Sequence, residues 1–431
     1  MGIEIKNVRA LLRKDSKNVI ENTSIYIEND IISSIGQAPD GFVCDKIIDG
    51  TDKLAIPGLI NCHTHSYMAF MRNVADDLSF MDWLFGRIDP IENRMTDEDA
   101  YWGACLGILE MMKSGTTCFN DMQMNPFQTT KAIKESGMRA VISRGLVGSG
   151  PEDEGGVRRV NETYAEMEFC KDCDRITFMM GPHAPYTCSE EYFRYVSDEA
   201  KKHNLGIHVH LSESCSEIEG TKEKYGFSPI KMAQKNGLFD VKAIAAHCVW
   251  VDEEDMDILA ANNVSVVSNP ASNMKLGNGF APIPSMMEKG INICLGTDGA
   301  ASNNSLNMFH EMNLMALIHK GLGKTPQCID ADEVVNMATI NGAKALGLEE
   351  KIGSLEVGKK ADIAILNLKV PSLMPINNLI AGLAYSANGS EVETVIVNGR
   401  ITMENRKVLT MDEELIYQKV NEVIKRCNIQ V

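Results

Sequence analysis

Two histidines stand two residues apart at the end of an apolar stretch, Pro57-Gly58-Leu59-Ile60-Asn61-Cys62-His63-Thr64-His65. Because successive side chains of a strand point to opposite faces, His63 and His65 would present their imidazoles on the same side. Two imidazoles placed in this way can bind one zinc ion, at about 2.0–2.1 Å each. A polar strand end exposed to solvent would carry the same two residues, so the pair alone leaves both interpretations open.

Further residues that can bind a metal or transfer protons follow other apolar, strand-like stretches. They are Arg144, His183, His210 with Glu213 three residues on, His247, Asn269 and Asp298. With His63 and His65, five of the nine histidines come at predicted strand ends, which chance scatter explains poorly. Since barrel enzymes place their active sites where the parallel strands end, the pattern predicts that these residues meet in one metal site.

Four of these residues form a coherent ligand set: His63, His65, His210 and Asp298. Three imidazole nitrogens and one carboxylate suit zinc or another divalent transition metal. A catalytic metal keeps one position open for a water molecule, whose pKa it lowers toward about 7. The sequence therefore predicts a hydrolytic rather than a purely structural metal site.

Other polar residues near these ligands have predicted roles in proton transfer or packing. Glu213 could move protons between the water and a substrate nitrogen, and His247 could orient the water through a hydrogen bond. His208 shares a strand face with His210 but stands deeper in the strand, so we interpret it as a packed barrel residue rather than a ligand.

Alternating strand and helix patterns must position these residues. Eight apolar segments read as strands: Ile56–Cys62, Thr116–Asn120, Arg139–Ser143, Ile176–Met180, Gly206–Val209, Ala243–Ala246, Val264–Ser268 and Ile291–Gly296. Amphipathic stretches fill the gaps, including a helix that starts at Thr96 with Asp99 three residues on, and that turns Ala100, Trp102 and Leu106 inward. Eight strands with intervening helices predict an α/β fold of the (β/α)8 TIM-barrel type.

Short β-type segments precede and follow the barrel pattern. We predict a small discontinuous β-sandwich domain composed of residues 1–56 and 354–431, with the catalytic barrel at 57–353 between them. A helix, Asp412 to Arg426, is expected near the C-terminal end. Residues 66–95 show no clear periodicity, and a long segment at the active face of a barrel is usually a lid or a substrate wall.

Composition excludes several classes of protein. The 431 residues carry a formal charge of −17, which argues against a nucleic-acid surface, and no apolar run is long enough to predict a membrane span. The start of the chain lacks the apolar region of a secretion signal, so we expect a cytoplasmic protein with reduced thiols. Cys170 and Cys173 have CxxC spacing without a second pair, which does not predict a metal site. We also expect a homo-oligomer.

The motifs are recognisable as those of a known family. The His63-Thr64-His65 stretch, Gly181-Pro182-His183-Ala184-Pro185, His210-Leu211-Ser212-Glu213 and Gly296-Thr297-Asp298-Gly299 resemble the amidohydrolase superfamily. Within it, the chain is similar over nearly its whole length to the deaminases of 5-methylthioadenosine and S-adenosylhomocysteine. Related binuclear enzymes use a modified lysine at the end of strand four, where this chain has none. The resemblance therefore implies one divalent metal per subunit, zinc in the first place, with Fe²⁺ or Mn²⁺ as alternatives.

The resemblance also implies substrate-binding residues. Asp82-Trp83-Leu84 and Glu92 resemble the substrate loop of these deaminases, in which the acidic residue holds the ribose hydroxyls and the tryptophan packs near the ligand. Arg144 and His183 match positions that contact substrate. A second substrate arginine is expected near Val157-Arg158-Arg159, where the spacing departs from the family pattern; Arg158 is our prediction and Arg159 stays open.

The reaction predicted from these residues is hydrolytic deamination of an adenine ring carried on a 5′-substituted ribose. A water molecule attacks C6, Glu213 passes its proton to N1, His247 and Asp298 steady the tetrahedral centre, and ammonia leaves. The metal motifs are shared by cytosine, guanine and triazine aminohydrolases, so another aminated heterocycle is the nearest alternative. A non-catalytic protein of this fold is a third reading, disfavoured because all four ligands and Glu213 are present.

Overall fold

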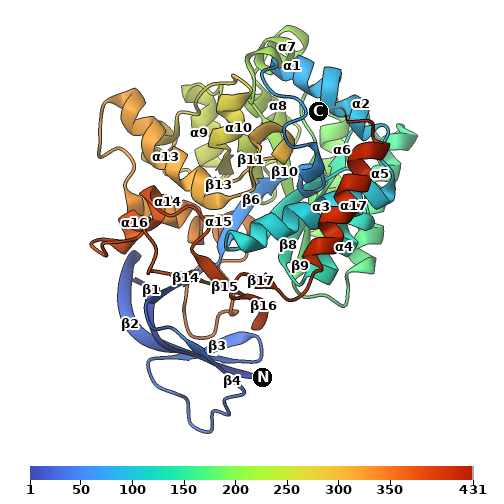
Figure 1. Ribbon diagram of the computed structural model, residues 1–431. Coiled ribbons are helices and arrows are strands. Elements are labelled where there is room, and N and C mark those ends of the chain that lie inside the picture. Colours follow the sequence, from blue (N-terminus) through green and yellow to red (C-terminus); the bar gives the residue numbers. More distant parts are fainter. Residues whose placement is uncertain (430–431) are drawn as a thin grey trace.

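The computed structural model describes residues 1–429. Eight parallel strands organise the larger part of it (Figure 1). They are β6 (Leu59–Thr64), β7 (Thr116–Gln123), β8 (Arg139–Leu146), β9 (Ile176–Pro182), β10 (Gly206–Leu211), β11 (Ala243–His247), β12 (Ser265–Ser268) and β13 (Ile293–Leu295). Each strand pairs with the next in chain order, as a parallel barrel requires. The predicted α/β barrel is confirmed, and several strands run further toward their carboxyl ends than the sequence indicated.

The first and last barrel strands are joined at a seam of hydrogen bonds. Beyond β13, the Asp298 N–H donates to the His63 carbonyl at 2.9 Å. The Asn61 side chain accepts from the Thr297 N–H at 3.0 Å and donates to the Thr297 hydroxyl at 2.7 Å. Because β6 and β13 carry residues from opposite ends of the barrel sequence, this seam brings His63 and Asp298 together.

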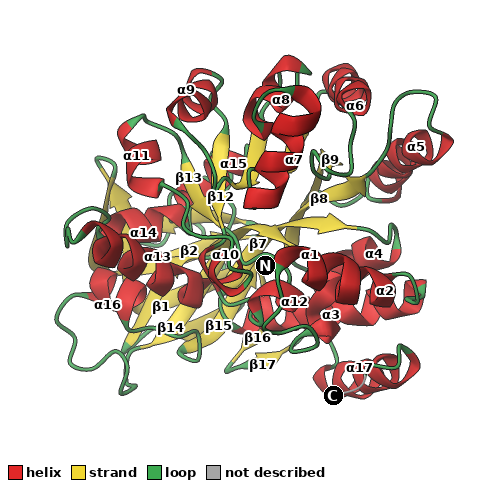
Figure 2. Ribbon diagram, turned by 90° about the horizontal axis from the view of Figure 1, so that it is seen from above, coloured by secondary structure: helices red, strands yellow, loops and turns green. Residues whose placement is uncertain are grey.

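Helices surround the strands, as the view from above shows (Figure 2). In chain order those between the strands are α3 (Asp97–Lys113), α4 (Gln128–Ser136), α5 (Glu154–Phe169), α6 (Glu190–His203), α7 (Cys215–Tyr225), α8 (Pro229–Lys235), α9 (Glu253–Ala261), α10 (Pro270–Lys275) and α11 (Ile283–Glu288). After β13 come α12 (Ala300–Asn303), α13 (Met308–Gly323), α14 (Ala331–Met337) and α15 (Ile340–Leu346).

Helix α3 begins as the sequence predicts. Thr96 is its N-cap, and the Thr96 hydroxyl and the Asp99 carboxylate form the reciprocal bonds of a capping box. Ala100 is fully buried, and Trp102 and Leu106 pack against the core while staying partly exposed. The Trp102 indole donates to Glu98 at 3.3 Å, one turn earlier on the outer side of the helix.

The segment between β6 and α3 is not a structureless loop. It contains four short helical pieces: η1 (Ser66–Met71), α1 (Phe80–Trp83), η2 (Leu84–Ile88) and α2 (Asp89–Glu92). All six residues of η1 are buried, and Trp83 is 6% exposed, so the segment packs on the barrel rather than extending into solvent. Pieces this short carry no helical periodicity, which is why the sequence did not reveal them.

A second, nine-stranded sheet combines strands from both ends of the chain. Its strands are β1 (Gly2–Lys14), β2 (Lys17–Glu28), β3 (Ile31–Ile35), β4 (Lys46–Asp49), β5 (Lys53–Pro57), β14 (Ile363–Asn367), β15 (Val392–Val397), β16 (Arg400–Glu404) and β17 (Lys407–Val408). β5 pairs with β1 on one side and with β14 on the other, which joins the two ends. The boundaries 1–56 and 354–431 for a composite domain stay a prediction.

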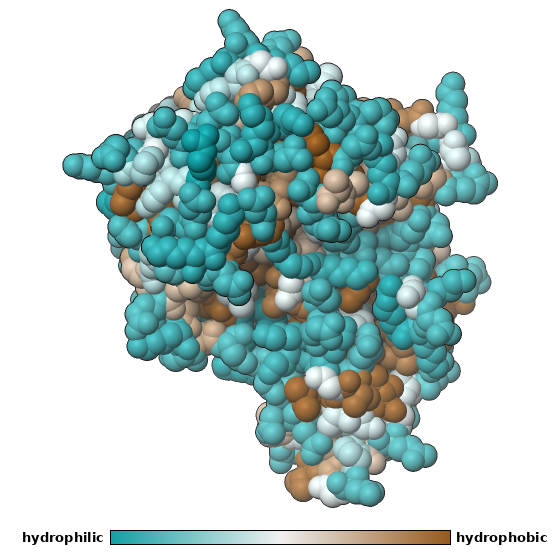
Figure 3. Space-filling model, turned by 180° about the vertical axis from the view of Figure 1, so that it is seen from behind, coloured by the Kyte–Doolittle hydropathy of each residue, from teal (hydrophilic) through white to brown (hydrophobic). Residues whose placement is uncertain are grey.

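Two helices belong to the chain beyond β14, α16 (Leu379–Tyr385) and α17 (Glu413–Arg426). α17 lies along α3 in Figure 1, and its first residue, Glu413, forms an ion pair with Lys113 at the end of α3. Seen from behind, the surface is mostly hydrophilic, with an apolar patch on the lower lobe (Figure 3). Among the described helices, none has the length and apolar character needed to cross a membrane.

Candidate active site

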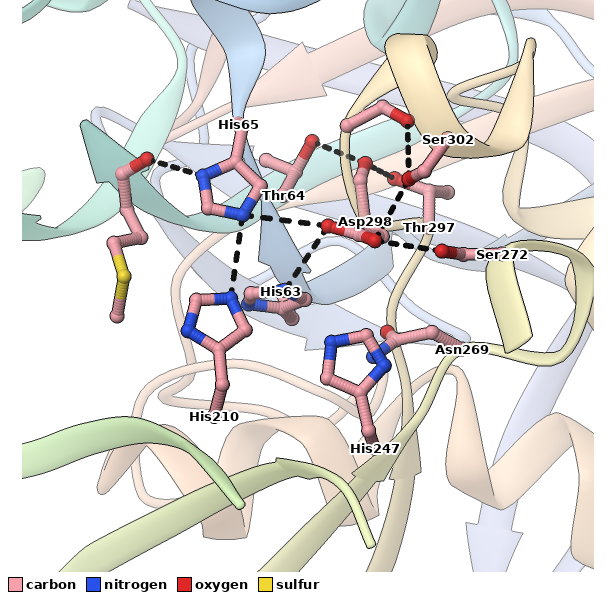
Figure 4. A network of polar contacts seen from close by, with 12 residues as sticks. His63, Thr64, His65, His210, His247, Asn269, Ser272, Thr297, Asp298 and Ser302 are labelled. Atoms are coloured by element: carbon pink, nitrogen blue, oxygen red, sulfur yellow. Dashed lines mark hydrogen bonds and ion pairs between the residues drawn. The ribbon is translucent and has the colours of Figure 1, made fainter. Parts of the chain in front are cut away.

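The four predicted metal ligands converge at the carboxyl ends of the barrel strands (Figure 4). His63 and His65 lie on β6 and just after it, His210 lies on β10, and Asp298 follows β13. Asp298 Oδ1 is 3.2 Å from His63 Nε2 and 3.3 Å from His65 Nε2. His210 Nε2 is 3.4 Å from His65 Nε2. His63, His65 and Asp298 thus form one group that could hold a metal, and His63 and His210 form a second such group together with His247.

The protonation states of these rings fit a bound cation. His65 Nδ1 lies 2.7 Å from the Met122 carbonyl, and His210 Nδ1 lies 2.8 Å from the His183 carbonyl. Because a carbonyl only accepts, each Nδ1 carries the hydrogen, and in a neutral ring each Nε2 then presents a lone pair. Two lone pairs facing each other repel unless a cation lies between them. The residues therefore fit a divalent metal.

His63 supplies a further sign of the same kind. Within the described part of the chain, its buried Nε2 has no hydrogen-bond partner, although it faces Asp298. Buried polar atoms without partners are rare in folded proteins and call for an explanation. A metal ligated by His63 Nε2 would provide it.

Asp298 is held so that one oxygen stays available. Its Oδ2 accepts hydrogen bonds from the Ser272 and Ser302 hydroxyls, both at 2.7 Å, while Oδ1 faces the histidines (Figure 4). Burial on its own would raise the pKa of this carboxyl, but the neighbouring His63 and His65 outweigh burial and hold the pKa well below its usual range. Asp298 is therefore an ionised carboxylate suited to bind a cation.

Several residues at this edge of the barrel adopt left-handed backbone conformations. The φ angles are +56° at Ser212, +73° at His247, +47° at Cys248 and +61° at Asp298. For residues other than glycine such conformations cost about 1–3 kcal/mol each and persist where surrounding contacts enforce them. They turn the chain sharply after β10, β11 and β13, which directs the following side chains into the site.

Glu213 lies beside the metal group in a buried position. Its Oε1 accepts a hydrogen bond from the Asn278 amide at 3.1 Å, and its Oε2 is 3.7 Å from His247 Nε2. Burial, followed by the charge of Asp298, raises the pKa of Glu213 well above its usual value. A carboxyl whose pKa lies above its usual value takes up a proton more readily, which suits a residue that transfers protons during a reaction.

His247 is oriented by the Asn273 side chain, whose oxygen lies 2.8 Å from His247 Nδ1. The Asn273 oxygen accepts only, so Nδ1 donates to it and the neutral ring presents Nε2 as an acceptor toward Glu213. His247 Nε2 lies 3.7 Å from Glu213 Oε2, and its role in orienting a reacting water stays a prediction.

The predicted substrate residues Trp83 and His183 are linked to the metal group by a series of aromatic rings. The Phe80 ring lies 6.2 Å from the Trp83 ring and 6.2 Å from the Tyr186 ring, measured between centroids. Tyr186 lies 5.7 Å from His183, and His183 lies 4.9 Å from the candidate ligand His210. The segment of α1 therefore forms an apolar wall next to the candidate metal site.

Glu92 lies at the end of α2 and accepts a hydrogen bond from the Tyr67 hydroxyl. Burial is the largest cause that raises the pKa of its carboxyl. The charge of His65 acts in the opposite direction, which places Glu92 within electrostatic reach of the metal group. A partly buried carboxylate in this position is available to a polar ligand.

The predicted arginines lie differently from each other. Arg144 is buried, and its Nε donates to Glu162 at 3.0 Å. Arg158 is on the outer side of α5, with its side chain 65% exposed and 3.3 Å from the same Glu162. The structure does not bring Arg158 to the metal group. Arg159 instead lines a cavity of about 380 Å³ together with Tyr186.

Some residues of the site were missed by sequence reasoning. The Glu217 carboxylate accepts the backbone N–H groups of Ser212 and Glu213, both at 2.8 Å, and burial raises the pKa of Glu217 to about 7. Its position four residues after Glu213, on the first turn of α7, is a signal that could have found it. Asn278 carries no comparable signal, because it reaches Glu213 from a loop distant in sequence.

Known proteins that are similar to this chain also indicate a metal-dependent hydrolase. Residues 54–402 match the amidohydrolase family. The chain is 47% identical over 427 residues to the 5-methylthioadenosine/S-adenosylhomocysteine deaminase of Thermoanaerobacter pseudethanolicus, with 99% of both chains covered. It is 43% identical over 434 residues to the enzyme of the same name from Acetivibrio thermocellus, again with 99% of each covered.

Solved structures show the same architecture. An adenosine deaminase from Xanthomonas campestris with bound zinc superposes with a TM-score of 0.92 at 28% identity, covering 99% of both chains. A guanine deaminase from C. acetobutylicum has a TM-score of 0.83 at 22% identity, covering 93% of this chain and 100% of the other. At that identity the second likeness shows the fold alone.

Proposed function

The chain belongs to the amidohydrolase family, and on this premise we propose that it is a metal-dependent hydrolytic deaminase of 5′-substituted adenosines. The substrates are S-adenosylhomocysteine and 5′-methylthioadenosine, with adenosine or 5′-deoxyadenosine as further candidates, and the products are the inosine analogue and ammonia. The observation that carries this proposal is the cluster of His63, His65, His210 and Asp298 beside the buried Glu213, whose pKa is raised by burial. The names of the relatives support the choice of substrate.

One divalent metal per subunit, zinc in the first place, is held by His63, His65, His210 and Asp298 in this proposal. The bound zinc of the similar adenosine deaminase supports that choice, and Fe²⁺ or Mn²⁺ are the alternatives. When bound, the metal supplies a Lewis acid that lowers the pKa of a water molecule toward about 7.

The residues of the chain supply the proton transfers. Glu213 takes the proton of the attacking water and delivers it to N1 of the ring, which makes C6 electrophilic. Because Asn278 donates to one oxygen of Glu213, the other oxygen faces His247 and stays free to exchange the proton. His247 orients the attacking water, and Asp298 steadies the tetrahedral centre and passes the second proton of that water to the amino group, which then leaves as ammonia.

The substrate lies between the metal group and the aromatic wall. Trp83 packs on it, Glu92 accepts from the ribose hydroxyls, and His183 contacts the purine. Arg144 is the predicted contact for a polar group. For the second arginine we prefer Arg159 to the predicted Arg158, because Arg159 lines the cavity beside Tyr186 and Arg158 faces solvent. A cytoplasmic location and a homo-oligomeric state complete the proposal.

Replacing Glu92 tests the substrate class. Glu92→Ala removes the acceptor for the ribose hydroxyls, and the loss of a charged hydrogen bond of about 1.5–3 kcal/mol lowers kcat/KM roughly ten- to hundred-fold. The assay compares ammonia release from S-adenosylhomocysteine with release from free adenine, which has no ribose. Asp89→Ala, at an exposed carboxylate of the same short helix α2, is the matched control.

The expected result is a loss on the nucleoside alone, with the Asp89 variant unchanged. An equal loss of kcat/KM on the nucleoside and on the free base would mean that Glu92 supports the fold and does not bind the ribose. It would favour the alternative, a deaminase of free heterocycles such as guanine or cytosine.

A further inference from the structure

A chain of buried polar groups leads from the barrel interior to the candidate ligand His63. His63 Nδ1 lies 2.9 Å from His208 Nε2, and His208 Nδ1 lies 3.1 Å from the Ser143 hydroxyl. Ser143 donates to the Asn120 side-chain oxygen at 3.2 Å, and the Asn120 amide donates to the Cys62 carbonyl at 3.0 Å. His63, His208, Ser143 and Asn120 are all fully buried. We call these four residues the His208 relay.

The Asn120 end of the His208 relay fixes the direction of every hydrogen bond in it. The Cys62 carbonyl only accepts, so the Asn120 NH₂ faces it and the Asn120 oxygen faces Ser143. The Ser143 hydroxyl has one hydrogen, which is used toward that oxygen, so toward His208 the hydroxyl accepts. His208 Nδ1 therefore carries a hydrogen.

The same reasoning extends to the metal ligand. A fully buried His208 that touches only His63 and Ser143 through its nitrogens stays neutral, because burying an unpaired charge is costly. With its hydrogen on Nδ1, His208 accepts through Nε2. His63 then carries its hydrogen on Nδ1 and leaves a lone pair on Nε2, the atom without a partner beside Asp298.

We propose that His208 is a positioning residue that fixes His63 in the tautomer able to bind the metal, with Ser143 and Asn120 setting its polarity. This inference rests on the metal site of the proposed function. His65 and His210 obtain the same tautomer from backbone carbonyls, which cannot reverse. The partner of His63 is His208, an imidazole that could either accept or donate at Nε2. The hydrogen bonds to Ser143 and Asn120 keep it an acceptor.

The first experiment observes the tautomer directly in the metal-free wild-type protein. The full chain is labelled with ¹⁵N in its histidine rings, and nitrogen chemical shifts separate protonated from unprotonated ring nitrogens. A His63→Asn sample identifies the His63 signals. We expect both His63 and His208 to be protonated on Nδ1 and unprotonated on Nε2. A His63 ring protonated on Nε2, or a mixture of both tautomers, would overturn the inference.

The second experiment measures zinc affinity by competition with a chelator, without any substrate. His208→Leu and Ser143→Ala break the His208 relay and should weaken binding about 10–100-fold, the usual effect of losing a partner behind a metal ligand. His208→Gln can donate to Ser143 and accept from His63, so it should bind nearly as tightly as the wild type. Ser197→Ala, which removes a buried hydroxyl that bonds the Gly237 carbonyl away from the site, is the matched control.

Equal zinc affinity in His208→Leu and the wild type would also refute the role of the His208 relay. If a variant fails to fold, the wild-type tautomer measurement still decides. A wild type that binds no zinc would refute the proposed function instead, and the two failures are therefore distinguishable.

Discussion

Glu217 offers a sharp test of how the acid–base residue is held. Its two carboxylate oxygens accept the N–H groups of Ser212 and Glu213, each at 2.8 Å. Ser212 has a left-handed backbone with φ of +56°, so this turn needs an external contact to hold it. Glu217 is buried, and its carboxylate bonds the backbone of the turn that carries Glu213. Its effect on catalysis should therefore act through the position of Glu213.

The expected losses of folding stability and of turnover in Glu217→Gln follow from these contacts. A glutamine has one oxygen, so its NH₂ group must face one of the two backbone N–H groups and leave that donor buried and unsatisfied. This costs about 1–3 kcal/mol of folding free energy. If the turn relaxes and Glu213 moves by about 1 Å, turnover falls by up to about 10²-fold. KM should change little, since no substrate contact is removed.

The assay combines denaturant unfolding with steady-state kinetics on S-adenosylhomocysteine. Glu391→Gln is the matched control, because Glu391 is equally buried and accepts the Asn388 N–H at 3.1 Å, but in the small sheet region. Both variants should lose similar stability, and only Glu217→Gln should lose kcat. A Glu217 variant with reduced stability and wild-type kcat would refute the reasoning, because the turn would then not position Glu213.

Three further outcomes follow from the site and the core. Glu213→Gln should lower turnover about 10²–10⁴-fold while zinc still binds, as measured by metal analysis of the assayed sample; near wild-type turnover would remove its proton role. Added zinc should raise the unfolding free energy by about 4 kcal/mol at a thousand-fold excess over its Kd, and Asp298→Ala should abolish this rise in thermal unfolding. Burial lowers the pKa of His319 on α13 from 6.5 to about 4. Because the folded pKa lies below the unfolded one, His319 adds stability above pH 6.5 that is lost as the pH falls toward 4, about 2 kcal/mol between pH 7 and pH 5. Unfolding at these two pH values should show a smaller difference in His319→Gln, and an unchanged difference would contradict a neutral buried ring.

The sequence revealed those features that depend on local periodicity. Apolar strands ending in histidines gave the barrel and its active edge, because a two-residue repeat fixes which side chains share a face. The capping box at Thr96 identified the start of α3 for a similar reason. Each of these signals lies within a few consecutive residues.

Hydrogen bonds between side chains distant in sequence could not be predicted. Asn278 reaches Glu213 across 65 residues of chain, and His208 reaches His63 across 145. The choice between Arg158 and Arg159 depends on the rotation of α5, which is fixed by its N-cap at Asp153 and by packing rather than by the arginines. Adjacent helical residues point about 100° apart, so one faces solvent and the other the cavity.

The most direct test of the central claim is ammonia release by the zinc-loaded protein across one substrate panel. The panel contains S-adenosylhomocysteine, 5′-methylthioadenosine, 5′-deoxyadenosine and adenosine beside free adenine, guanine and cytosine. The account predicts rapid release from the 5′-substituted adenosines and far less from the free bases. Release from guanine or cytosine with none from any adenosine derivative would contradict it.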